Sequence, residues 1–313
     1  MDCDVLVLGS LVMDRKYFAA GGLGPADTVW GVQRHPGGVG RNIAVNTARL
    51  GARTVFAGLS GSGPDAAVLE AELTDLGIRL HVLRTTDGIG TFDVLLDERG
   101  RQITSRIELP DPAGGRTLAG PHLAGTIAAA QAVVAEGGLD GDLLTWVSRR
   151  ARKHAVPMVC LPTRQRDLGP RTRLLPLYDV LVLNAREAQA LTGQPGSAVE
   201  QARRLLGLGL RLVVVTAGAD GAAVASAGRP TPLALPAEAG PCNDDTGAGD
   251  ALASAFVTHL VRGARPGAAL ALGLRAARRT IGCPQSTCRS LATDPVLTAR
   301  RTGPWTPPGA RAW

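Results

Sequence analysis

The sequence predicts an α/β protein whose central sheet is mostly parallel and covered by helices on both faces. Three observations lead to this prediction: strand-like runs alternate with helix-length segments, several of the runs are apolar throughout, and 45% of the 313 residues are hydrophobic. Continuously apolar strands separated by helices are typical of parallel sheets that are buried on both faces. At this length we expect one domain with a small appendage rather than two equal domains.

Strand-like and helix-like segments follow one another along the chain. The expected strands are rich in β-branched residues and leucine: 5–8, 54–59, 132–135, 157–161, 180–183 and 212–216. The expected helices repeat apolar residues at helical spacing: 39–50, 66–76, 143–154, 185–191, 199–206, 248–262 and 268–281.

Two segments, 17–33 and 91–107, interrupt this alternation, and the second has strand-like character on both sides of a turn at 98–100. Together they predict a small antiparallel sheet. Because both emerge from the carboxyl ends of expected strands, where open α/β proteins bind ligands, a lid over an active site is one interpretation. A surface hairpin without function is the alternative. We therefore expect one domain over 1–302 that includes these lid segments, and a disordered tail rich in Pro and Gly at 303–313.

The composition restricts the partners that the protein can have. The chain has a formal net charge of +7 without a basic tract, and only 3% of its residues are aromatic. Few aromatic side chains leave little surface for base stacking, so we expect no nucleic-acid partner, although an anionic nucleotide is compatible. No apolar run reaches the roughly 18 residues of a membrane span, and no basic leader precedes the first strand. We expect a cytoplasmic protein without a membrane partner.

The cysteines favour a reduced environment. There are five of them, and they lack the paired C-x-x-C spacing of zinc sites. Cys283 and Cys288 are near enough in the sequence to pair under oxidation, but we expect isolated thiols there.

A glycine-rich segment, Asp-Asp-Thr-Gly-Ala-Gly-Asp at 244–250, opens one expected helix. Gly247 and Gly249 would let the backbone approach a phosphate, and the free N–H groups and dipole of a first helical turn favour negative charge. Asp250 could accept a proton from a hydroxyl that attacks the phosphate. An N-capping cluster is an equally good interpretation of this segment alone.

Another glycine turn, which comes first in the chain, is Pro-Gly-Gly-Val-Gly-Arg-Asn at 36–42, and it also precedes an expected helix. Gly37 and Gly38 would allow backbone amides to reach substrate hydroxyls, and Asn42 offers both donors and an acceptor. Asn46 lies one helical turn beyond Asn42. In isolation, such a glycine turn is weak evidence.

Together, the two glycine segments, G-G-x-G-x-N and D-x-T-G-A-G-D, resemble the two signatures of the ribokinase-like, or PfkB, carbohydrate and nucleoside kinases. The resemblance covers about residues 4–285. It implies a ribokinase-like three-layer α/β/α fold with a mostly parallel central sheet. It also implies ATP and Mg²⁺ as cofactors, and transfer of phosphate to a primary hydroxyl.

Three further segments resemble motifs of this family. The run 9–14 is similar to its first-strand motif, whose aspartate, here Asp14, binds sugar hydroxyls. Asn184 and Glu187 are similar to its N-x-x-E motif, which organises magnesium and the phosphates, with Glu187 acting through water. The nucleotide-contacting turn of the family resembles a segment with three matching residues: Thr216, Gly218 and Gly221.

Within the family, the run 37–51 is most similar to pseudouridine kinases because it carries Arg41 and Asn46. This implies pseudouridine, converted to its 5′-phosphate, as the first candidate acceptor, with ribokinase, fructokinase or another nucleoside kinase as alternatives. Asp245 and Leu161 depart from the family pattern, because relatives commonly carry Thr or Val at the first position and often Asp at the second.

Other classes fit the sequence less well. A P-loop kinase is excluded, because neither Lys16 nor Lys153 follows a glycine in G-K-[S/T]. The G-x-G-x-x-A match at 61–66 would suit an NAD-dependent oxidoreductase, but its proline and its position after the second strand argue against one. A catalytically inactive regulator that binds a sugar or a nucleotide is the remaining alternative, since a fold does not guarantee chemistry.

These observations give one set of site predictions. Asp250 is the expected base, and the amides of Gly247, Ala248 and Gly249 are expected to bind the transferring phosphate. The expected substrate ligands are Asp14, Gly37, Gly38, Asn42 and Asn46. The expected ATP and magnesium residues are Asn184, Glu187, Thr216, Gly218 and Gly221. The expected partners are ATP, Mg²⁺ and a small sugar or nucleoside, and the sequence is compatible with a monovalent cation and with a homodimer.

Overall fold

The computed structural model describes residues 3–19, 29–86, 88–97, 102–162, 172–240, 245–283 and 285–299. The expected turn at 98–100 and the expected tail at 303–313 lie outside the described residues. The same holds for Asp244, the first residue of the second glycine segment.

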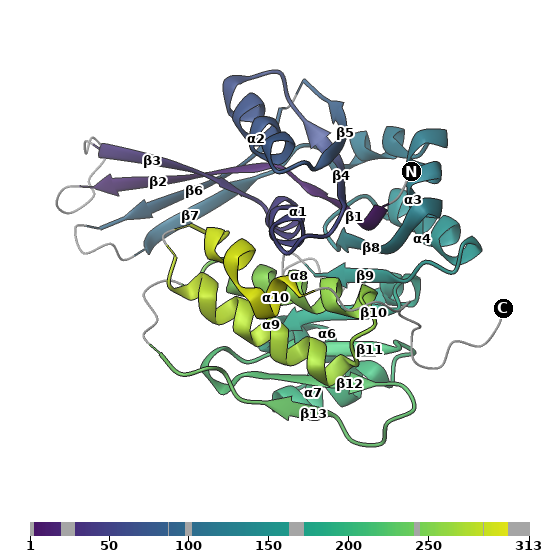
Figure 1. Ribbon diagram of the computed structural model, residues 1–313. Coiled ribbons are helices and arrows are strands. Elements are labelled where there is room, and N and C mark those ends of the chain that lie inside the picture. Colours follow the sequence, from purple (N-terminus) through teal and green to yellow (C-terminus); the bar gives the residue numbers. More distant parts are fainter. Residues whose placement is uncertain are drawn as a thin grey trace.

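A central sheet forms the middle layer of the molecule (Figure 1). In the described part of the chain it has nine strands, in the order β13-β12-β11-β10-β9-β8-β1-β4-β5. Their bounds are β1 (Cys3–Ser10), β4 (Thr54–Ser60), β5 (Arg79–Arg84), β8 (Ala130–Glu136), β9 (Met158–Leu161), β10 (Val180–Asn184), β11 (Leu212–Thr216), β12 (Ala222–Ser226) and β13 (Leu233–Leu235). Seven neighbouring strands of this sheet, β11-β10-β9-β8-β1-β4-β5, are parallel. At one edge, β12 pairs antiparallel with β11, and β13 pairs antiparallel with β12. The six predicted strands are confirmed, and β5, β12 and β13 were not predicted.

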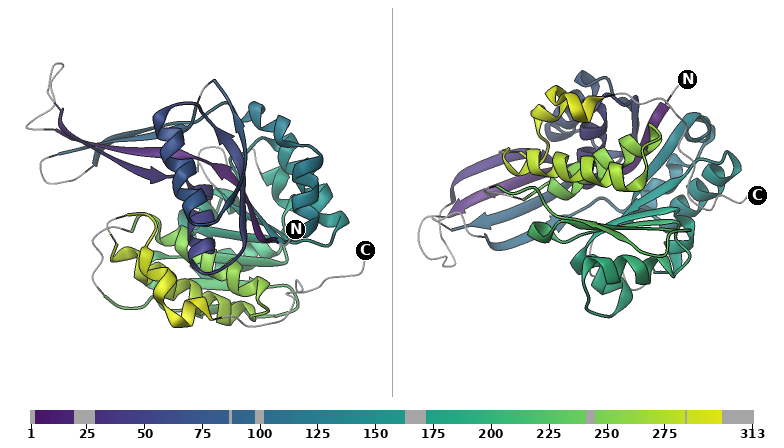
Figure 2. Two further views of the ribbon diagram at one scale, coloured as in Figure 1. Left: turned by 45° about the horizontal axis from the view of Figure 1, so that its top comes forward. Right: turned by 60° about the horizontal axis from the view of Figure 1, so that its bottom comes forward.

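Two helical layers cover the sheet (Figure 2). One face packs against α1 (Val39–Arg49), α2 (Pro64–Asp75), α8 (Ala248–Val261) and α9 (Pro266–Ile281). The other packs against α3 (Pro121–Ala129), α4 (Gly141–Lys153), α6 (Ala185–Thr192) and α7 (Ala198–Leu206). Alternate strand residues serve the two layers, as Val5 and Val7 do on one face and Leu6 and Leu8 on the other. The seven predicted helices are confirmed with boundaries shifted by a few residues, while α3 and the short α10 (Pro295–Thr298) were not predicted.

The order of the strands reverses at β1. The chain first adds β4 and β5 on one side of β1, and then returns to β8 on the other side and continues outward to β11. Open α/β sheets bind ligands beside the carboxyl ends of strands at such a reversal. The carboxyl ends of β1 and β8 are therefore the place to look for a site.

A second, smaller sheet projects from the central body (Figure 1). Its order is β3-β2-β6-β7, formed by β2 (Val12–Ala19), β3 (Val29–Gly37), β6 (Gly90–Leu96) and β7 (Gln102–Glu108). The expectation of a purely antiparallel sheet is wrong, because β2 and β6 pair in parallel. These two strands follow β1 and β5, which are parallel strands of the central sheet, so they leave the same edge of that sheet in the same direction.

The small sheet begins earlier than predicted, at Val12, and its β3 continues to Gly37. Asp14 is therefore a residue of β2 and not of the first central strand. Arg15 of β2 forms an ion pair with Asp65 at the start of α2, at 3.0 Å, and Arg34 of β3 lies 3.5 Å from the same carboxylate. The segment 61–66 of the oxidoreductase interpretation thus supplies a contact that anchors the small sheet.

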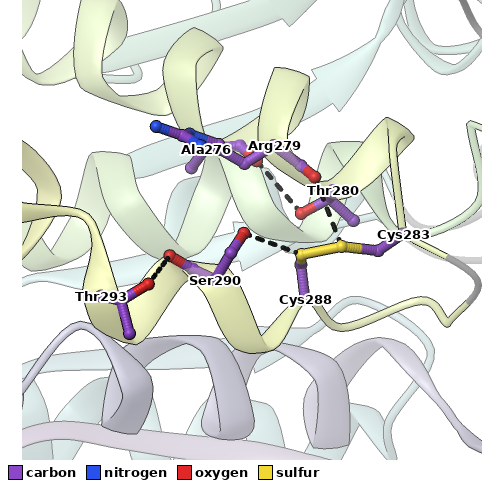
Figure 3. The surroundings of a disulfide bond; sticks show 7 residues. All are labelled: Ala276, Arg279, Thr280, Cys283, Cys288, Ser290 and Thr293. Atoms are coloured by element: carbon purple, nitrogen blue, oxygen red, sulfur yellow. Dashed lines mark hydrogen bonds between the residues drawn. A yellow bond between two sulfur atoms is a disulfide. The ribbon is translucent and has the colours of Figure 1, made fainter.

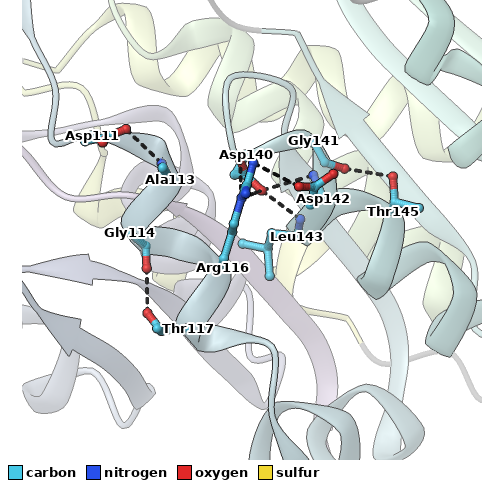
Figure 4. Close-up of polar contacts among 10 residues, drawn as sticks. All are labelled: Asp111, Ala113, Gly114, Arg116, Thr117, Asp140, Gly141, Asp142, Leu143 and Thr145. Carbon is cyan, nitrogen blue, oxygen red and sulfur yellow. Dashed lines mark hydrogen bonds and ion pairs between the residues drawn. The ribbon is translucent and has the colours of Figure 1, made fainter.

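The loop that leads from β8 into α4 is fixed by a helix cap (Figure 4). Asp140 accepts hydrogen bonds from the amides of Asp142 and Leu143, both at 3.0 Å, which satisfies two free donors of the first turn of α4. Arg116, in the 3₁₀ helix Pro112–Leu118, lies 3.2 Å from Asp140 and 2.9 Å from Asp142. Because Arg116 is largely exposed, the cap contributes more to this loop than the ion pairs do.

Cys283 and Cys288 form a disulfide after the end of α9, with their Cα atoms 5.7 Å apart (Figure 3). The expectation of isolated thiols is therefore wrong at these two positions, because the fold brings the two cysteines within bonding distance. Cys3 and Cys160 are free and buried. Burial raises the pKa of the Cys3 thiol to about 11, so this thiol is a poor nucleophile.

Within the described residues, no helix is both long enough and apolar enough to cross a lipid bilayer.

Candidate active site

The site forms where the carboxyl ends of β1 and β8 meet the first turns of α1 and α8. α1 follows the first glycine turn, and α8 follows the second. The two helices pack against each other, so the two glycine segments, about 200 residues apart in the sequence, are brought together.

The start of α1 requires glycine at two positions. Gly38, its N-cap, has φ 97°, and a Cβ there would lie 2.6 Å from the carbonyl oxygen of Ser10. A Cβ on Gly37 would lie 2.3 Å from Oδ1 of Asp14. The Asp14 carboxyl group thus sits directly over the backbone of the glycine turn. Burial raises the pKa of Asp14 to about 6, and the nearby charges of Arg41 and Lys16 oppose that rise.

Glu136, the last residue of β8, connects β1 to α1. Its carboxylate accepts hydrogen bonds from the amide of Ser10 at 3.1 Å, from the Ser10 hydroxyl at 2.9 Å, and from the amide of Gly40. Only glycine fits around this group, because a Cβ on Gly9 or on Gly40 would lie 2.8 Å from Glu136 Oε1. A negative charge here also suits the N-terminal end of the α1 dipole.

The start of α8 differs from that of α1, because no counterpart of Glu136 contacts its first turn among the residues that the structure describes. Its N-cap, Gly247, has φ 81°, and a Cβ there would lie 2.0 Å from the carbonyl oxygen of Ser286. A Cβ on Gly249 would meet nothing within 4 Å. The Ala248 amide donates to the carbonyl oxygen of Asp245 at 3.0 Å, so within the described residues the open part of the first turn is beside Gly249, where an anion would find a helix N-terminus.

Asp250, also in the first turn of α8, contacts α1 through Asn42. The Asn42 side-chain amide donates to Asp250 Oδ2 at 2.8 Å. Burial raises the pKa of Asp250 to about 7, and the negative charges of Glu136, Glu187 and Asp14 add to the rise, while the Asn42 hydrogen bond opposes it. A carboxyl group with a pKa near neutrality, in contact with an open anion site, is suited to accept a proton.

Asn184 and Glu187 lie at the end of β10 and the start of α6, where they form a reciprocal capping box. The Glu187 amide donates to Asn184 Oδ1 and the Asn184 amide donates to Glu187 Oε2, both at 2.9 Å. Burial raises the pKa of Glu187 to about 7. The motif that was expected to organise magnesium thus also fixes the start of a helix.

The predicted nucleotide turn lies beside this capping box, because Thr216 of β11 pairs in register with Asn184 of β10. Gly218 and Gly221 have φ 59° and 90°, so the turn between β11 and β12 needs glycine at both positions. A Cβ on Gly221 would also lie 2.1 Å from the carbonyl oxygen of Leu235. The backbone conformation therefore explains glycine at these two positions even without a bound nucleotide.

Two predicted specificity residues are buried behind the site. Asn46 has no exposed surface, so its side chain offers nothing for a substrate to touch in this structure. Arg41 is 2% exposed and forms an ion pair with Glu72 of α2. The structure thus brings Asp14, Gly37, Gly38, Asn42 and Asp250 together and keeps Asn46 apart from them.

Sequence reasoning missed several residues of the site. Glu136 carried a usable signal, because a carboxylate that ends an apolar strand lies at the ligand-binding edge of a parallel sheet. Ser286 and Thr287 carried none: they lie within the disulfide-closed turn, where the Ser286 hydroxyl is 3.3 Å from Asn42 Oδ1 and the Thr287 hydroxyl is 3.5 Å from the Arg41 guanidinium.

A helix N-terminus beside a carboxyl group, at the point where the strand order of an α/β/α fold reverses, is compatible with phosphate transfer to a small molecule. The chain belongs to the pfkB family of carbohydrate kinases, whose family model matches residues 3–292.

Curated relatives agree with this assignment. The mouse protein named ribokinase is 27% identical over 235 residues, which cover 72% of this chain and 71% of the mouse protein. The bifunctional protein HldE of Azotobacter vinelandii is 27% identical over 296 residues and matches 89% of this chain. The chain spans 60% of the length of that bifunctional relative.

Solved structures share the fold. Arabidopsis thaliana ribokinase, complexed with ribose and ATP, superposes with a TM-score of 0.79 at 21% identity and covers 96% of this chain and 100% of its own. The adenosine kinase of Sinorhizobium meliloti gives a TM-score of 0.78 at 19% identity, with coverage of 94% and 98%. The central sheet with its smaller companion sheet is therefore the ribokinase-like fold, as the sequence predicted.

Proposed function

We propose that the protein transfers the γ-phosphoryl group of ATP to a primary hydroxyl of a sugar or nucleoside. One observation carries this proposal: the Asp250 carboxyl, whose pKa is raised to about 7, stands at the uncapped first turn of α8. Asp250 would take the proton of the attacking hydroxyl while the amides of Gly247 and Gly249 bind the oxygens of the transferring phosphate. The Ala248 amide would join them only by leaving the carbonyl oxygen of Asp245, to which it donates at 3.0 Å. The protein supplies position and electrostatic stabilisation, without a covalent intermediate.

The charges around the site fit a metal ion. Asp14, Glu136 and Glu187 each raise the pKa of Asp250, so the site has an excess of negative charge that a cation would offset. The capping box engages one oxygen of Glu187 and leaves the other for a water or a cation. When bound with ATP, Mg²⁺ would neutralise charge on the phosphates, and Glu187 is the residue that would hold it, through water. We also keep a monovalent cation as a proposed cofactor, and we assign no residues to it.

The acceptor would lie against the first glycine turn. The Asp14 carboxyl covers the backbone of Gly37 and the Asn42 amide lies at Asp250, so these two side chains would bind the substrate hydroxyls, with Gly37 and Gly38 allowing the close approach of Asp14 and β1. The small sheet, which carries Asp14 on β2, would act as a lid that keeps water from competing as the acceptor. ATP would occupy the neighbouring strand ends, near Asn184 and Thr216, which pair in register.

The small sheet also favours a homodimer. Ile103 and Ile107 of its edge strand β7 are each about half accessible, and apolar side chains exposed on an edge strand favour association. Light scattering would test the homodimer by measuring the molar mass of the protein in solution.

Pseudouridine is the acceptor we place first, because the run from Gly37 to Asn42 resembles that of pseudouridine kinases. Arg41 and Asn46 are buried, so discrimination would come from other residues that face the acceptor. A C-linked uracil has an N–H group that uridine lacks, and a buried acceptor for that group would disfavour uridine by about tenfold or more.

An ADP-release assay with ribose, fructose, adenosine, uridine and pseudouridine tests this function, with mass spectrometry to locate the new phosphate. We expect acceptor-dependent ADP release that Asp250→Asn lowers by about 10²- to 10⁴-fold. If another compound gives a higher kcat/KM than pseudouridine, the acceptor assignment is wrong and the kinase remains. ATP binding without turnover on any acceptor would instead favour an inactive regulator.

A further inference from the structure

A buried arginine lies directly behind the proposed base. Arg41 is in the first turn of α1 and is 2% exposed. Its guanidinium forms an ion pair with Glu72 of α2 and donates to Asn42 Oδ1 at 2.9 Å and to the carbonyl oxygen of Pro36 at 3.2 Å. A buried charge is tolerated when it is paired and hydrogen-bonded, and these partners satisfy the two terminal nitrogens of Arg41, while its Nε has no partner among the described residues.

These contacts decide which way the Asn42 amide points. Arg41 donates to Asn42 Oδ1, and the Ser286 hydroxyl lies 3.3 Å from the same oxygen. With its oxygen engaged by two donors, the amide must direct its NH₂ group the other way, and that group donates to Asp250 Oδ2 at 2.8 Å. A reversed amide would place its NH₂ group against the Arg41 guanidinium and its oxygen against the Asp250 carboxylate, so both contacts would become repulsive.

We propose that Arg41, anchored by Glu72, is a positioning residue that acts through Asn42 to hold the Asp250 carboxylate in its working orientation. The inference rests on the proposed function, in which Asp250 is the base. Arg41 reaches Asp250 only through Asn42 in this chain of contacts, which runs from α2 through α1 to α8.

The electrostatics of the site give the direction of the effect. Burial, Glu136, Glu187 and Asp14 all raise the pKa of Asp250, and the hydrogen bond from Asn42 lowers it. Without Arg41 the Asn42 amide is free to turn, the hydrogen bond weakens, and the pKa of Asp250 rises further. Less of the base is then ionised at neutral pH. Arg41 also lowers the pKa of Asp14, so a pH profile alone does not isolate the path through Asn42.

The test begins with Arg41→Met, which keeps the length of the side chain and removes its donors. We expect kcat to fall about ten- to a hundredfold and the acid limb of the kcat profile to move to higher pH, with the KM for ATP unchanged. Glu72→Gln should also lower kcat and move the acid limb to higher pH, but by less than Arg41→Met does. Since Glu72 is partly exposed, this variant should fold even if Arg41→Met does not.

Arg49→Met is the matched control. Arg49 lies on the same helix, is 7% exposed, and has its guanidinium 4.0 Å from Glu72. It makes no contact with Asn42 among the residues that the structure describes, so its loss should lower the melting temperature and leave the acid limb of the kcat profile in place.

A double-mutant cycle with Asn42→Ala decides the path. If Arg41 acts through Asn42, then Arg41→Met should change kcat by less than about twofold in the Asn42→Ala background. An undiminished loss in that background, or a Glu72→Gln profile identical to wild type, would overturn the inference. Turnover that survives Asp250→Asn would contradict the proposed function instead, so the two failures are distinguishable.

Discussion

The first turns of α1 and α8 are built from the same kind of sequence and have opposite roles. Each helix begins at a glycine with a positive φ, Gly38 or Gly247, and neither N-cap residue supplies a side-chain cap. At α1 the Glu136 carboxylate occupies the helix end by binding the amide of Gly40. At α8 no carboxylate of the described residues accepts from the first turn, where the Ala248 amide donates to the carbonyl oxygen of Asp245.

The difference shows that a glycine turn before a helix is only a potential anion site. Whether it binds a ligand depends on whether the fold supplies an anion of its own, and that anion comes from a distant segment: Glu136 is 96 residues from Gly40. We infer that the start of α1 is mainly a structural junction and that the start of α8 is left free for phosphate. Substitutions on the two sides should therefore separate stability from turnover.

The largest expected effect is at α8. Asp250→Asn removes the proton acceptor and keeps the size of the side chain, so kcat should fall by about 10²- to 10⁴-fold while ATP affinity, measured by calorimetry, changes little. Near-normal turnover would show that Asp250 is not the base. For the wild-type enzyme, kcat/KM should decline on the acid side with an apparent pKa of about 7, because the base must be ionised.

Asp250→Asn should lower turnover but raise the stability of the folded protein. The pKa of Asp250 is raised from 3.8 to about 7 in the folded protein, so its contribution to stability is complete below about pH 4 and is lost as the pH rises through 7. Asp250→Asn should therefore raise the melting temperature, relative to wild type, by more at pH 8 than at pH 5. A uniform loss of stability at both values would contradict this account.

At α1 the expected effect is on stability. Glu136→Ala leaves the buried amides of Ser10 and Gly40 without their acceptor and should lower the free energy of unfolding by about 2 to 4 kcal/mol. Glu136→Gln is the control, because its amide oxygen can still accept from both amides and the Ser10 hydroxyl can rotate to accept from its NH₂ group. Denaturant unfolding checks both. If Glu136→Ala instead abolished turnover in a fully stable protein, our division between the two helix ends would be wrong.

Asn42 spans the two helix ends and should show an intermediate effect. Asn42→Ala removes a contact with the proposed acceptor and the hydrogen bond to Asp250, so we expect the KM for the acceptor to rise about tenfold and kcat to fall by a similar factor. The KM for ATP should stay within about twofold of wild type. Steady-state kinetics with each substrate varied in turn measures all three, and an equal loss of ATP affinity would place Asn42 on the wrong side of the site.

Local pattern was sufficient to predict the buried parallel strands, because their apolar runs can be recognised without knowledge of the fold. β11 has the predicted bounds, Leu212–Thr216. β5 was missed because it is an edge strand: Arg79–Arg84 is half exposed and alternates too weakly to be distinguished from a loop. The parallel pairing of β2 with β6 depends on where both strands leave the central sheet, which no local signal contains.

The sequence predicted those site residues that belong to one short segment and missed those that depend on contacts between distant segments. Gly247 is the N-cap of α8 and Asp250 lies in its first turn, so the local pattern at the start of this helix identified both. The burial of Arg41 depends on Glu72, a residue of another helix, and arginine is ordinarily exposed. The prediction for β8 stopped one residue before Glu136, because a carboxylate does not extend an apolar run. Contacts between segments that are far apart in the sequence decided what was missed.

The smallest expected effect separates the two helix ends most directly, by placing one methyl group at the same position of each. In Gly40→Ala the new Cβ would lie 2.6 Å from the Cα of Gly9 and 2.8 Å from Glu136, so backbone must move and stability should fall. In Gly249→Ala the Cβ meets nothing within 4 Å, and replacing a helical glycine should raise the free energy of unfolding by about 0.5 to 1 kcal/mol. The same methyl group would enter the space that we assign to the phosphate, so kcat/KM for ATP should fall about tenfold in the more stable variant. Unfolding and kinetic measurements on both variants check this, and a Gly249→Ala protein with unchanged kinetics would show that phosphate does not bind at the start of α8.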